Sequence, residues 1–332
     1  MLRQVIRTGL VLLSAAALSL CYPSSGSWGL AWIALVPLLI AAEEDAPGPA
    51  FLRGYAAGFV FFISTLFWIH HVTSLGLVLL CAYLALYWAV FCAAAAWFSC
   101  CGLERRVVFL PLLWAALEYL RSELFSGFGW AGLAHSQTAN ILFIQAADIT
   151  GTYGLSAVMV GAGVVMAAGI RCFLRREKPF LGFDIAAWGV ALVLVAVLVY
   201  GAVRLSFPAP SAKARVALIQ ANVSLADYAD PGLKPGLVAK HLALSREAMK
   251  GKPRLIIWPE TSFPQFIWEY PELFEQVKAF ARENRVKVLV GAVTLTGDDY
   301  FNSALLLDED GEAGRAYHKQ HLVLFGEYIP FR

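Results

Sequence analysis

Glu260 is the first ionisable side chain after a short apolar segment, residues 255–258. The continuous apolar run predicts a buried strand, and Pro259 ends it because proline has no N–H to donate to a sheet. Ligands of open α/β sheets gather outside the carboxyl ends of strands, where a partly buried carboxylate can act as a general base. The alternative is a strand-end carboxylate that only accepts hydrogen bonds from backbone amides.

Lys319 is the second residue whose type suits catalysis, since a lysine beside a developing oxyanion stabilises its negative charge. The alternative is an ordinary solvated surface charge. His318 and His321 flank Lys319 but have no third ligand close by in the sequence, so we expect no metal site. We expect no cofactor either.

The segments around these residues alternate between strands and helices, which predicts an α/β sandwich for the C-terminal part. One predicted helix begins with Pro271, because proline suits the first turn of a helix. The predicted strands are 215–220, 255–258, 286–293 and 303–307, and the predicted helices are 236–249 and 271–284.

The composition divides the chain into a membrane part and a water-facing part. Of the 332 residues, 59% are hydrophobic and 15% are charged, against about 45–50% and about 25% in ordinary soluble domains. The apolar excess lies before residue 206, so we expect a membrane domain at 1–206 and a separate domain at 213–332. The net charge of +2 comes with no basic stripe, which argues against nucleic acid as a partner.

Seven apolar stretches have, or nearly have, the length of about 20 residues that a spanning helix needs. A secretory signal is the alternative for the first stretch, because Arg3 and Arg7 precede its apolar core. The stretches are 5–22, 28–42, 54–71, 75–98, 107–120, 153–172 and 185–204.

Arginines and lysines in the predicted loops set the expected orientation. With a cytoplasmic N-terminus, nearly all of them lie on the cytoplasmic side, as the positive-inside rule requires. After seven spans the chain then emerges on the opposite side, so residues 213–332 are expected to be extracytoplasmic.

The loop between the fifth and sixth stretches has an unusual composition. Glu118 and Arg121 lie three residues apart, which puts them on one face of a helix. The Gly- and aromatic-rich segment 126–130, which includes Trp130, follows them and suits a membrane interface. Contact with a substrate and simple interfacial anchoring are both open for this loop.

Taken together, these residues resemble the nitrilase superfamily: Trp258-Pro259-Glu260, then strand, helix and strand, then Lys319 and Phe325-Gly326-Glu327. With seven spans in front, the chain resembles the apolipoprotein N-acyltransferase family over essentially its whole length. The resemblance extends to Trp114 with Glu118 and Arg121, and to segments 128–130 and 135–137. It implies a polytopic α-helical membrane domain followed by an α/β nitrilase-like sandwich domain, which is incomplete here.

That family uses a Glu–Lys–Cys triad, so the resemblance implies that Glu260 is the general base and Lys319 the oxyanion group. Glu327 matches a second glutamate of the pocket. The family's cysteine follows the lysine by a few tens of residues, whereas this sequence has no cysteine after Cys172. The 332-residue chain is therefore expected to lack the nucleophile and the last span, and to be inactive alone. Leu324 and Tyr228 stand where the family commonly has proline and tryptophan.

The implied reaction moves a fatty acyl chain from a phospholipid to the α-amino group of the diacylglyceryl-cysteine of an apolipoprotein, through a thioester. The expected partners are these two substrates and the lipid bilayer. We expect a monomer in the bacterial inner membrane, multi-pass, with its nitrilase-like domain on the periplasmic side. Three alternatives are a membrane-tethered nitrilase-type amidohydrolase, a transporter or other non-catalytic membrane protein, and a catalytically dead fragment.

Overall fold

The structure is a computed structural model of the 332-residue chain. It describes residues 2–22, 27–176, 181–207, 213–224, 227–228, 230–263, 267–323 and 327. The chain forms two compact units, Met1–Pro208 and Ala209–Arg332, and the predicted domain boundary between residues 206 and 213 brackets this division. Phe325, Gly326 and linker residues 208–211 lie outside the described residues. Each unit is described by itself.

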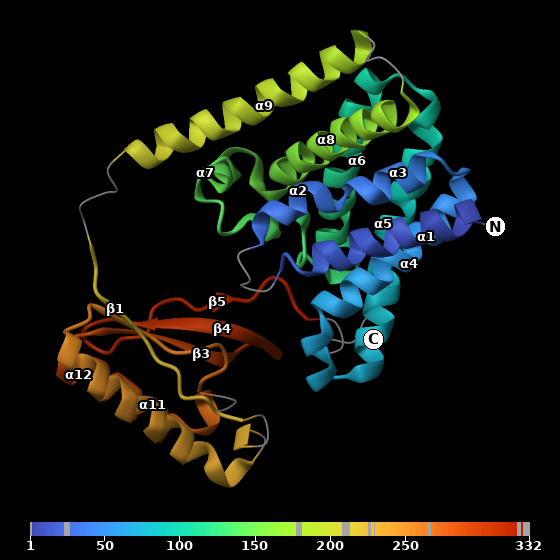
Figure 1. The fold of residues 1–332 in the computed structure, drawn as a ribbon. Coiled ribbons are helices and arrows are strands. Elements are labelled where there is room, and N and C mark those ends of the chain that lie inside the picture. The colour runs from blue at the N-terminus through green and yellow to red at the C-terminus, as the bar shows by residue number, and fades with distance from the viewer. Residues whose placement is uncertain are drawn as a thin grey trace. The chain divides into compact units, whose positions relative to one another are not determined.

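The first unit is helical, as its apolar composition predicts (Figure 1). Each of the seven predicted spans lies largely in helix. The helices are α1 (Leu2–Ser19), α2 (Ala31–Ala34), α3 (Val36–Glu43), α4 (Pro47–Thr65), α5 (Ser74–Trp97), α6 (Leu103–Glu123), α7 (Ile141–Ile144), α8 (Ala147–Arg175) and α9 (Leu181–Ser206).

Three helices of the described residues are long and apolar enough to cross a membrane: Ser74–Cys100, Ala147–Arg175 and Gly182–Ser206. The other four predicted spans stay predictions. The stretch 28–42 is not one continuous helix, because α2 ends before Leu35 and α3 starts after it. Pro37 in the first turn of α3 has no N–H for the carbonyl of Ile33, which accounts for the break.

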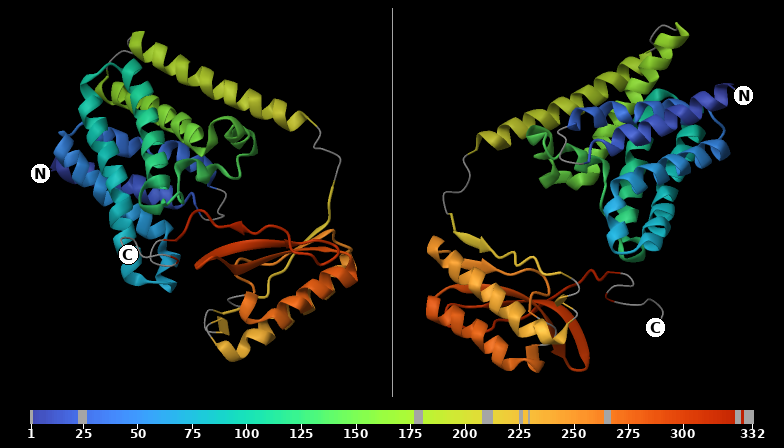
Figure 2. Two further views of the ribbon diagram at one scale, coloured as in Figure 1. Left: turned by 180° about the vertical axis from the view of Figure 1, so that it is seen from behind. Right: turned by 60° about the horizontal axis from the view of Figure 1, so that its bottom comes forward.

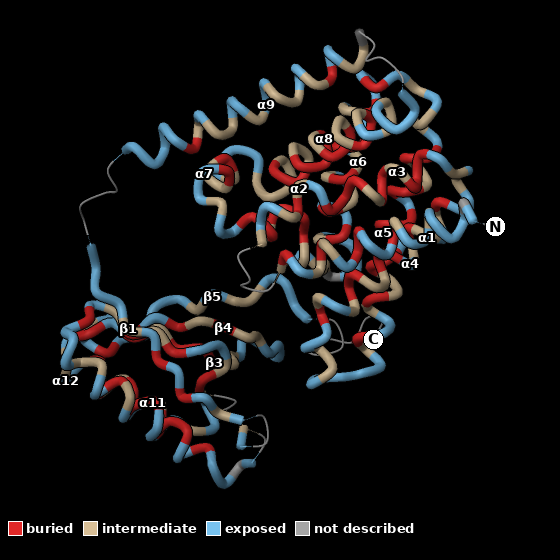
Figure 3. Tube along the Cα trace, in the orientation of Figure 1, coloured by how far each residue is buried: buried red, intermediate tan, exposed pale blue. Residues whose placement is uncertain are grey.

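Helix α3 lies inside the first unit and is buried around most of its circumference. Its Leu38 and Leu39 are fully buried. Helices α4 and α5 approach each other closely because Gly54 of α4 faces Cys92 of α5, where a Cβ on the glycine would come within 2.7 Å of Cys92 Cβ. In contrast, α9 is largely exposed along its length (Figure 3).

The second unit contains a five-stranded mixed sheet in the order β1-β2-β3-β4-β5 (Figures 1 and 2). Strands β1, β2 and β3 are parallel, while β3–β4 and β4–β5 are antiparallel. The strands are β1 (Val216–Leu218), β2 (Leu255–Ile257), β3 (Lys287–Thr296), β4 (Asp299–Leu307) and β5 (Tyr317–His318).

Helices α11 (Lys234–Ala248) and α12 (Pro271–Asn284) cover one face of this sheet. Fully buried side chains such as Val238 of α11, Val277 of α12 and Val288 of β3 join them to the sheet, and buried and exposed residues alternate along both helices (Figure 3). On the opposite face, Leu218 is 76% exposed. A helical region with candidate spans followed by a small mixed sheet domain confirms the predicted fold class, and the described part of the sandwich is one sheet with one helical layer.

Candidate active site

Glu260 lies in a tight turn directly after β2, at the carboxyl edge of the parallel strands. The turn is fixed to β3 on both sides, because the Trp258 amide donates to the Leu289 carbonyl at 2.9 Å and the Phe263 amide to the Gly291 carbonyl at 2.9 Å. Within it, Thr261 has a φ of 51°, in the left-handed region that non-glycine residues seldom occupy. The strand that sequence reasoning places at 255–258 therefore delivers Glu260 where α/β sheets collect their functional groups.

Lys319 comes directly after β5 and lies beside β4. Its amide donates to the Asn302 carbonyl at 2.8 Å, which continues the β4–β5 ladder by one residue. Side chains of paired residues share a face of a sheet, and the Ser303–His318 pair lies on the face that the helices cover. Asn302 and Lys319 each lie one residue away, so both side chains are on the opposite face.

The side chains of Glu260, Lys319 and Glu327 meet at one point. Lys319 Nζ donates to Glu260 Oε1 at 2.9 Å and to Glu327 Oε1 at 3.0 Å. Residues that lie 59 and 8 positions from the lysine in the sequence are thus in direct contact with its ammonium group. The geometry brings together all three residues that the sequence singles out, while their catalytic roles stay a proposal.

Asn302 is a fourth member of this cluster, and the sequence analysis did not identify it. Its Nδ2 donates to Glu260 Oε1 at 2.7 Å and to Glu327 Oε1 at 2.8 Å. It was missed because the predicted strand started at residue 303, whereas β4 begins at Asp299. If the predicted strand at 303–307 had started a few residues earlier, Asn302 would have been part of it, on the same face of the sheet as Lys319 and beside it.

Glu327 is held by the backbone as well as by side chains. Its Oε2 accepts a hydrogen bond from the Val323 amide at 2.8 Å, and its own amide donates to the Val323 carbonyl at 2.9 Å. This reciprocal pair joins Glu327 to the backbone of Val323, while its carboxylate contacts Lys319.

The charges of the cluster stabilise one another. Desolvation alone lowers the pKa of Lys319, but hydrogen bonds to Glu260 and Glu327 outweigh it and raise that pKa above its ordinary value. Desolvation alone raises the pKa of Glu327, but hydrogen bonds from Val323, Asn302 and Lys319 outweigh it and lower that pKa. The Glu260 side chain is 63% exposed, so within the described residues it faces solvent rather than the partly buried setting expected for a base.

The histidine next to Lys319 has a structural contact. His318 Nδ1 lies 2.8 Å from Ser303 Oγ, and its ring stacks on Phe301 at 4.3 Å between centroids. These contacts hold β5 against β4. They leave the histidine on the helix-covered face, opposite the cluster around Lys319.

In the first unit, Glu118 and Arg121 are buried but each bonds to the loop that follows α6. Glu118 Oε1 accepts hydrogen bonds from the Leu133 amide at 2.7 Å and from Trp114 Nε1 at 2.9 Å. Arg121 Nη1 donates to the Trp130 carbonyl at 2.7 Å. The two side chains line one small cavity of about 20 Å³, large enough for about one water molecule.

The rest of that loop is also held by polar side chains. Tyr22 Oη donates to the Gly132 carbonyl at 2.9 Å, and the Gly132 amide donates to His135 Nδ1 at 3.2 Å. Gln137 accepts from Trp32 Nε1 at 2.9 Å and donates to the Trp28 carbonyl at 2.8 Å. The backbone of Trp130 is therefore fixed, while its ring is exposed and lies 5.0 Å from that of Trp68.

Two family models match the chain. The apolipoprotein N-acyltransferase N-terminal domain matches residues 14–165, and carbon-nitrogen hydrolase matches residues 215–332. The apolipoprotein N-acyltransferase of Geobacter metallireducens is 38% identical over 97% of this chain and 64% of its own length. That of Allorhizobium ampelinum is 31% identical over 85% of this chain and 56% of its own length. The chain thus spans less than two thirds of the length of these two relatives.

Proposed function

The chain belongs to the apolipoprotein N-acyltransferase family, and we propose that it provides the general base and the oxyanion group of an acyl transfer from a phospholipid to an apolipoprotein amine. The observation that carries the proposal is the direct contact of Lys319 Nζ with Glu260 Oε1 at 2.9 Å. A base and a cation on one open sheet face can serve the same reacting carbonyl group.

In the first half of the proposed reaction, Glu260 accepts the proton of a cysteine thiol. The thiolate sulfur then bonds to the ester carbonyl carbon of the phospholipid, and the carbonyl oxygen takes up the electron pair. Lys319 stabilises this oxyanion. The ester C–O bond breaks, the lysophospholipid leaves with the proton from Glu260, and the acyl chain stays as a thioester.

In the second half, the α-amino nitrogen of the diacylglyceryl-cysteine attacks the thioester carbon. Glu260 takes a proton from that nitrogen, and Lys319 again stabilises the oxyanion. The C–S bond then breaks, and Glu260 gives the proton to the leaving sulfur. Residues 215–332 include no cysteine. The thiol in this proposal therefore comes only from the family resemblance.

Asn302 and Glu327 have supporting roles in this proposal. Asn302 donates to both carboxylates and so holds them on the two sides of the Lys319 ammonium. Glu327 keeps the lysine charged, since its carboxylate contacts Nζ at 3.0 Å. A lysine that stays protonated can act on an oxyanion through both steps.

The membrane part fits substrates that are themselves membrane-anchored. We place residues 213–332 on the periplasmic side of the bacterial inner membrane, from the distribution of arginines and lysines in the loops. The alternative is a nitrilase-type amidohydrolase that transfers the acyl group to water. A single span would suffice to tether such a hydrolase to the membrane, so the number of spans separates the two functions. The candidate spans Ser74–Cys100, Ala147–Arg175 and Gly182–Ser206 favour the lipid-dependent reaction.

The test is the change Glu260→Gln made in the gene at its own locus. The N-terminal peptides of cellular lipoproteins are then analysed by mass spectrometry. We expect diacylated peptides to accumulate, because loss of a general base slows proton transfer by about 10²- to 10⁴-fold. Glu283→Gln, at an exposed position of α12, is the matched control and should leave triacylation unchanged. Full triacylation in the Glu260→Gln strain would overturn the proposal.

A further inference from the structure

A large cavity opens at one end of the first unit, apart from the loop around Trp130. Its volume is about 750 Å³, and its walls come from the start of α1, the end of α3, the start of α6 and the end of α8. The walls are both charged and apolar, and Leu10 and Leu103 are among the apolar residues. Four arginines line it, Arg7, Arg106, Arg171 and Arg175, together with the glutamates Glu43 and Glu44.

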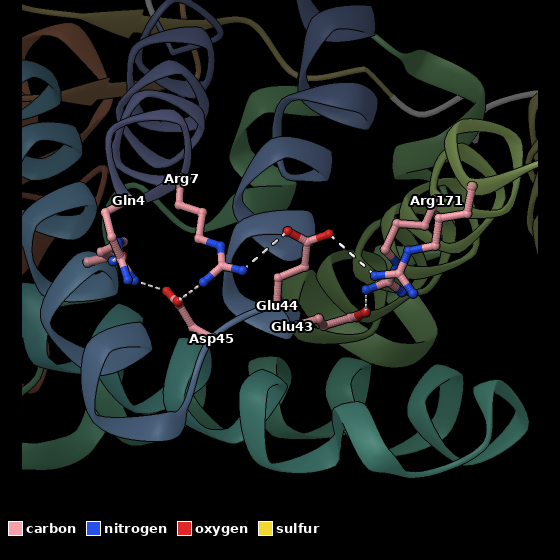
Figure 4. Close-up of polar contacts among 8 residues, drawn as sticks. Gln4, Arg7, Glu43, Glu44, Asp45 and Arg171 are labelled. Atoms are coloured by element: carbon pink, nitrogen blue, oxygen red, sulfur yellow. Dashed lines mark hydrogen bonds and ion pairs between the residues drawn. The ribbon is translucent and has the colours of Figure 1, made fainter. Parts of the chain in front are cut away.

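Glu43 fixes the inner wall of this cavity. Its side chain is fully buried, and its Oε2 contacts Arg106 at 2.6 Å and also Arg171 (Figure 4). Burial of a charge is costly unless it is paired, so this carboxylate needs both guanidinium groups. The triad ties α3, α6 and α8 together, and we regard it as structural.

Asp45 does not line the cavity, and it is paired with two arginines, of which Arg7 lines the cavity and Arg53 does not. Its carboxylate accepts from Arg7 Nη1 at 2.6 Å and contacts Arg53 as well. Since neither Asp45 nor Arg53 lines the cavity, their charges cancel behind it.

At the mouth of the cavity, the positive charges of the arginines are less closely paired with carboxylates. Glu44 Oε2 is 3.6 Å from Arg7 Nη2 (Figure 4), and Glu44 Oε1 is 3.5 Å from Arg175 Nη2. Both separations exceed the length of a good hydrogen bond. The four arginines and two glutamates of the lining leave an excess of two positive charges, and among the described residues Arg175 meets a carboxylate only at this separation of 3.5 Å.

The position of the cavity at the ends of candidate spans indicates which kind of anion could bind in it. Ser99 and Arg175 line it, and they lie at the ends of two candidate spans, Ser74–Cys100 and Ala147–Arg175. The cavity is thus level with the headgroups at one surface of a bilayer. Basic pockets between helices at this level suit the headgroups of anionic lipids, and guanidinium forks match the geometry of phosphate.

We propose that this cavity is a binding site for the phosphate of an anionic phospholipid headgroup, with Arg7 and Arg175 as the ligand-binding arginines at the mouth. The apolar residues Leu10 and Leu103 face the glycerol and the start of the acyl chains. The site is separate from the proposed acyl-donor site, which depends on residues of the second unit.

The experiment uses the full chain in a neutral detergent. The protein is incubated with micelles that contain phosphatidylglycerol or phosphatidylcholine, or with inorganic phosphate alone. Retained lipid is measured by native mass spectrometry, and stability by the melting temperature. We expect phosphatidylglycerol to be retained and to raise the melting temperature, and phosphatidylcholine to do neither.

Variants assign the binding to the cavity. Arg175 is 57% exposed, so Arg175→Gln should fold normally while it weakens phosphatidylglycerol binding about fivefold, the effect of one arginine near an anionic surface. Arg175→Lys should weaken it less. Arg204→Gln is the matched control, because Arg204 is 51% exposed in the last turn of α9 and pairs with Asp148.

Three results would overturn the proposal. An equal loss of binding in Arg204→Gln, or none in Arg175→Gln, would mean that the lipid binds elsewhere, for instance at the proposed acyl-donor site. A rise in melting temperature with inorganic phosphate that matches the rise with phosphatidylglycerol would assign the cavity to a free anion instead of a lipid.

Discussion

Gly291 of β3 lies directly against the backbone of Glu260. A Cβ at position 291 would come within 2.8 Å of Glu260 Cα and within 2.4 Å of the Pro259 carbonyl oxygen. Only glycine leaves room for the turn after β2 to lie this close to β3. The position of the candidate general base therefore depends on a residue that has no side chain and does no chemistry.

The first prediction follows from this contact. Gly291→Ala should push the turn away from β3 and displace Glu260 from Lys319, at a cost of about 1–3 kcal/mol in unfolding free energy, as overpacking usually does. Urea unfolding of the protein in detergent measures this cost. Gly236→Ala on α11 is the control, because a Cβ at that position would have no neighbouring atom within 4 Å. Equal stability of the two variants would contradict the packing argument.

The second prediction concerns pH. The pKa of Glu327 lies below its ordinary value of 4.5, so its contribution to stability is complete above pH 4.5 and disappears as the pH falls through the lowered value. The pKa of Lys319 lies above its ordinary value of 10.5, so its contribution is complete below pH 10.5 and disappears as the pH rises through the raised value. The contact between Val323 and Glu327 should thus be equally stable across the pH interval between 4.5 and 10.5.

Hydrogen exchange of the Val323 amide measures that stability, because this amide donates to Glu327. After correction for the intrinsic pH dependence of exchange, protection should be constant near neutral pH and fall in acid below pH 4.5 and in alkali above pH 10.5. Protection that stays constant as the pH falls below 4.5 would show that the carboxylate is not stabilised by its neighbours.

Sequence reasoning could find Glu260 because it follows an apolar strand that Pro259 ends, and Lys319 because of its residue type and the family resemblance. It could not show that they touch, since 59 residues separate them and the contact depends on the order of strands in the sheet. Asn302 was out of reach for a related reason. Its side chain acts across the β4–β5 ladder, and a strand that starts at Asp299 instead of 303 changes which residues share the site.

In the first unit the apolar runs predict the helices well but not their partners. Glu118 and Arg121 were expected on one helix face, and both are buried, yet each bonds to the backbone of a distant loop residue. The clustering of arginines around Glu43 and Glu44 was invisible for the same reason. Those arginines come from helices far apart in the chain, and charge patterning shows only which side of the membrane they share.

The third prediction tests Asn302 as a bridge between two carboxylates. Asn302→Ala should lower stability by about 1 kcal/mol, because the lost hydrogen bonds are to partly exposed charged groups. Asn302→Asp has nearly the same shape but adds a third carboxylate, so at pH 7 it should be less stable than Asn302→Ala. That extra loss should vanish as the pH falls through about 4, where the aspartate is protonated. Melting temperatures at pH 7 and pH 4 distinguish this from a purely steric role, which would show no such dependence.

The fourth prediction tests whether Glu118 stabilises the loop that follows α6. Glu118→Ala removes the acceptor that the Leu133 amide and Trp114 Nε1 share in a buried site, and each unsatisfied donor costs about 1–3 kcal/mol. Glu118→Gln keeps an acceptor oxygen and should cost less. The exposed Glu123, at the end of the same helix, serves as the control in Glu123→Ala. Proteolysis of segment 124–137 should be faster in Glu118→Ala alone, and equal cleavage of all three variants would mean that the loop is held in another way.

The last prediction concerns orientation and rests on α9. This helix is the last candidate span, its mean hydropathy is 2.4, and only 11% of its apolar window is buried inside the protein, so lipid is the natural environment for its exposed face. Arg175 and Arg176 precede it, which predicts a cytoplasmic start under the positive-inside rule. Reporter fusions placed after Arg176 and after Lys213 should therefore report the cytoplasm and the periplasm respectively. A fusion pair that reports the cytoplasm at both positions would mean that α9 does not cross the membrane, and it would contradict the proposed periplasmic placement of residues 213–332.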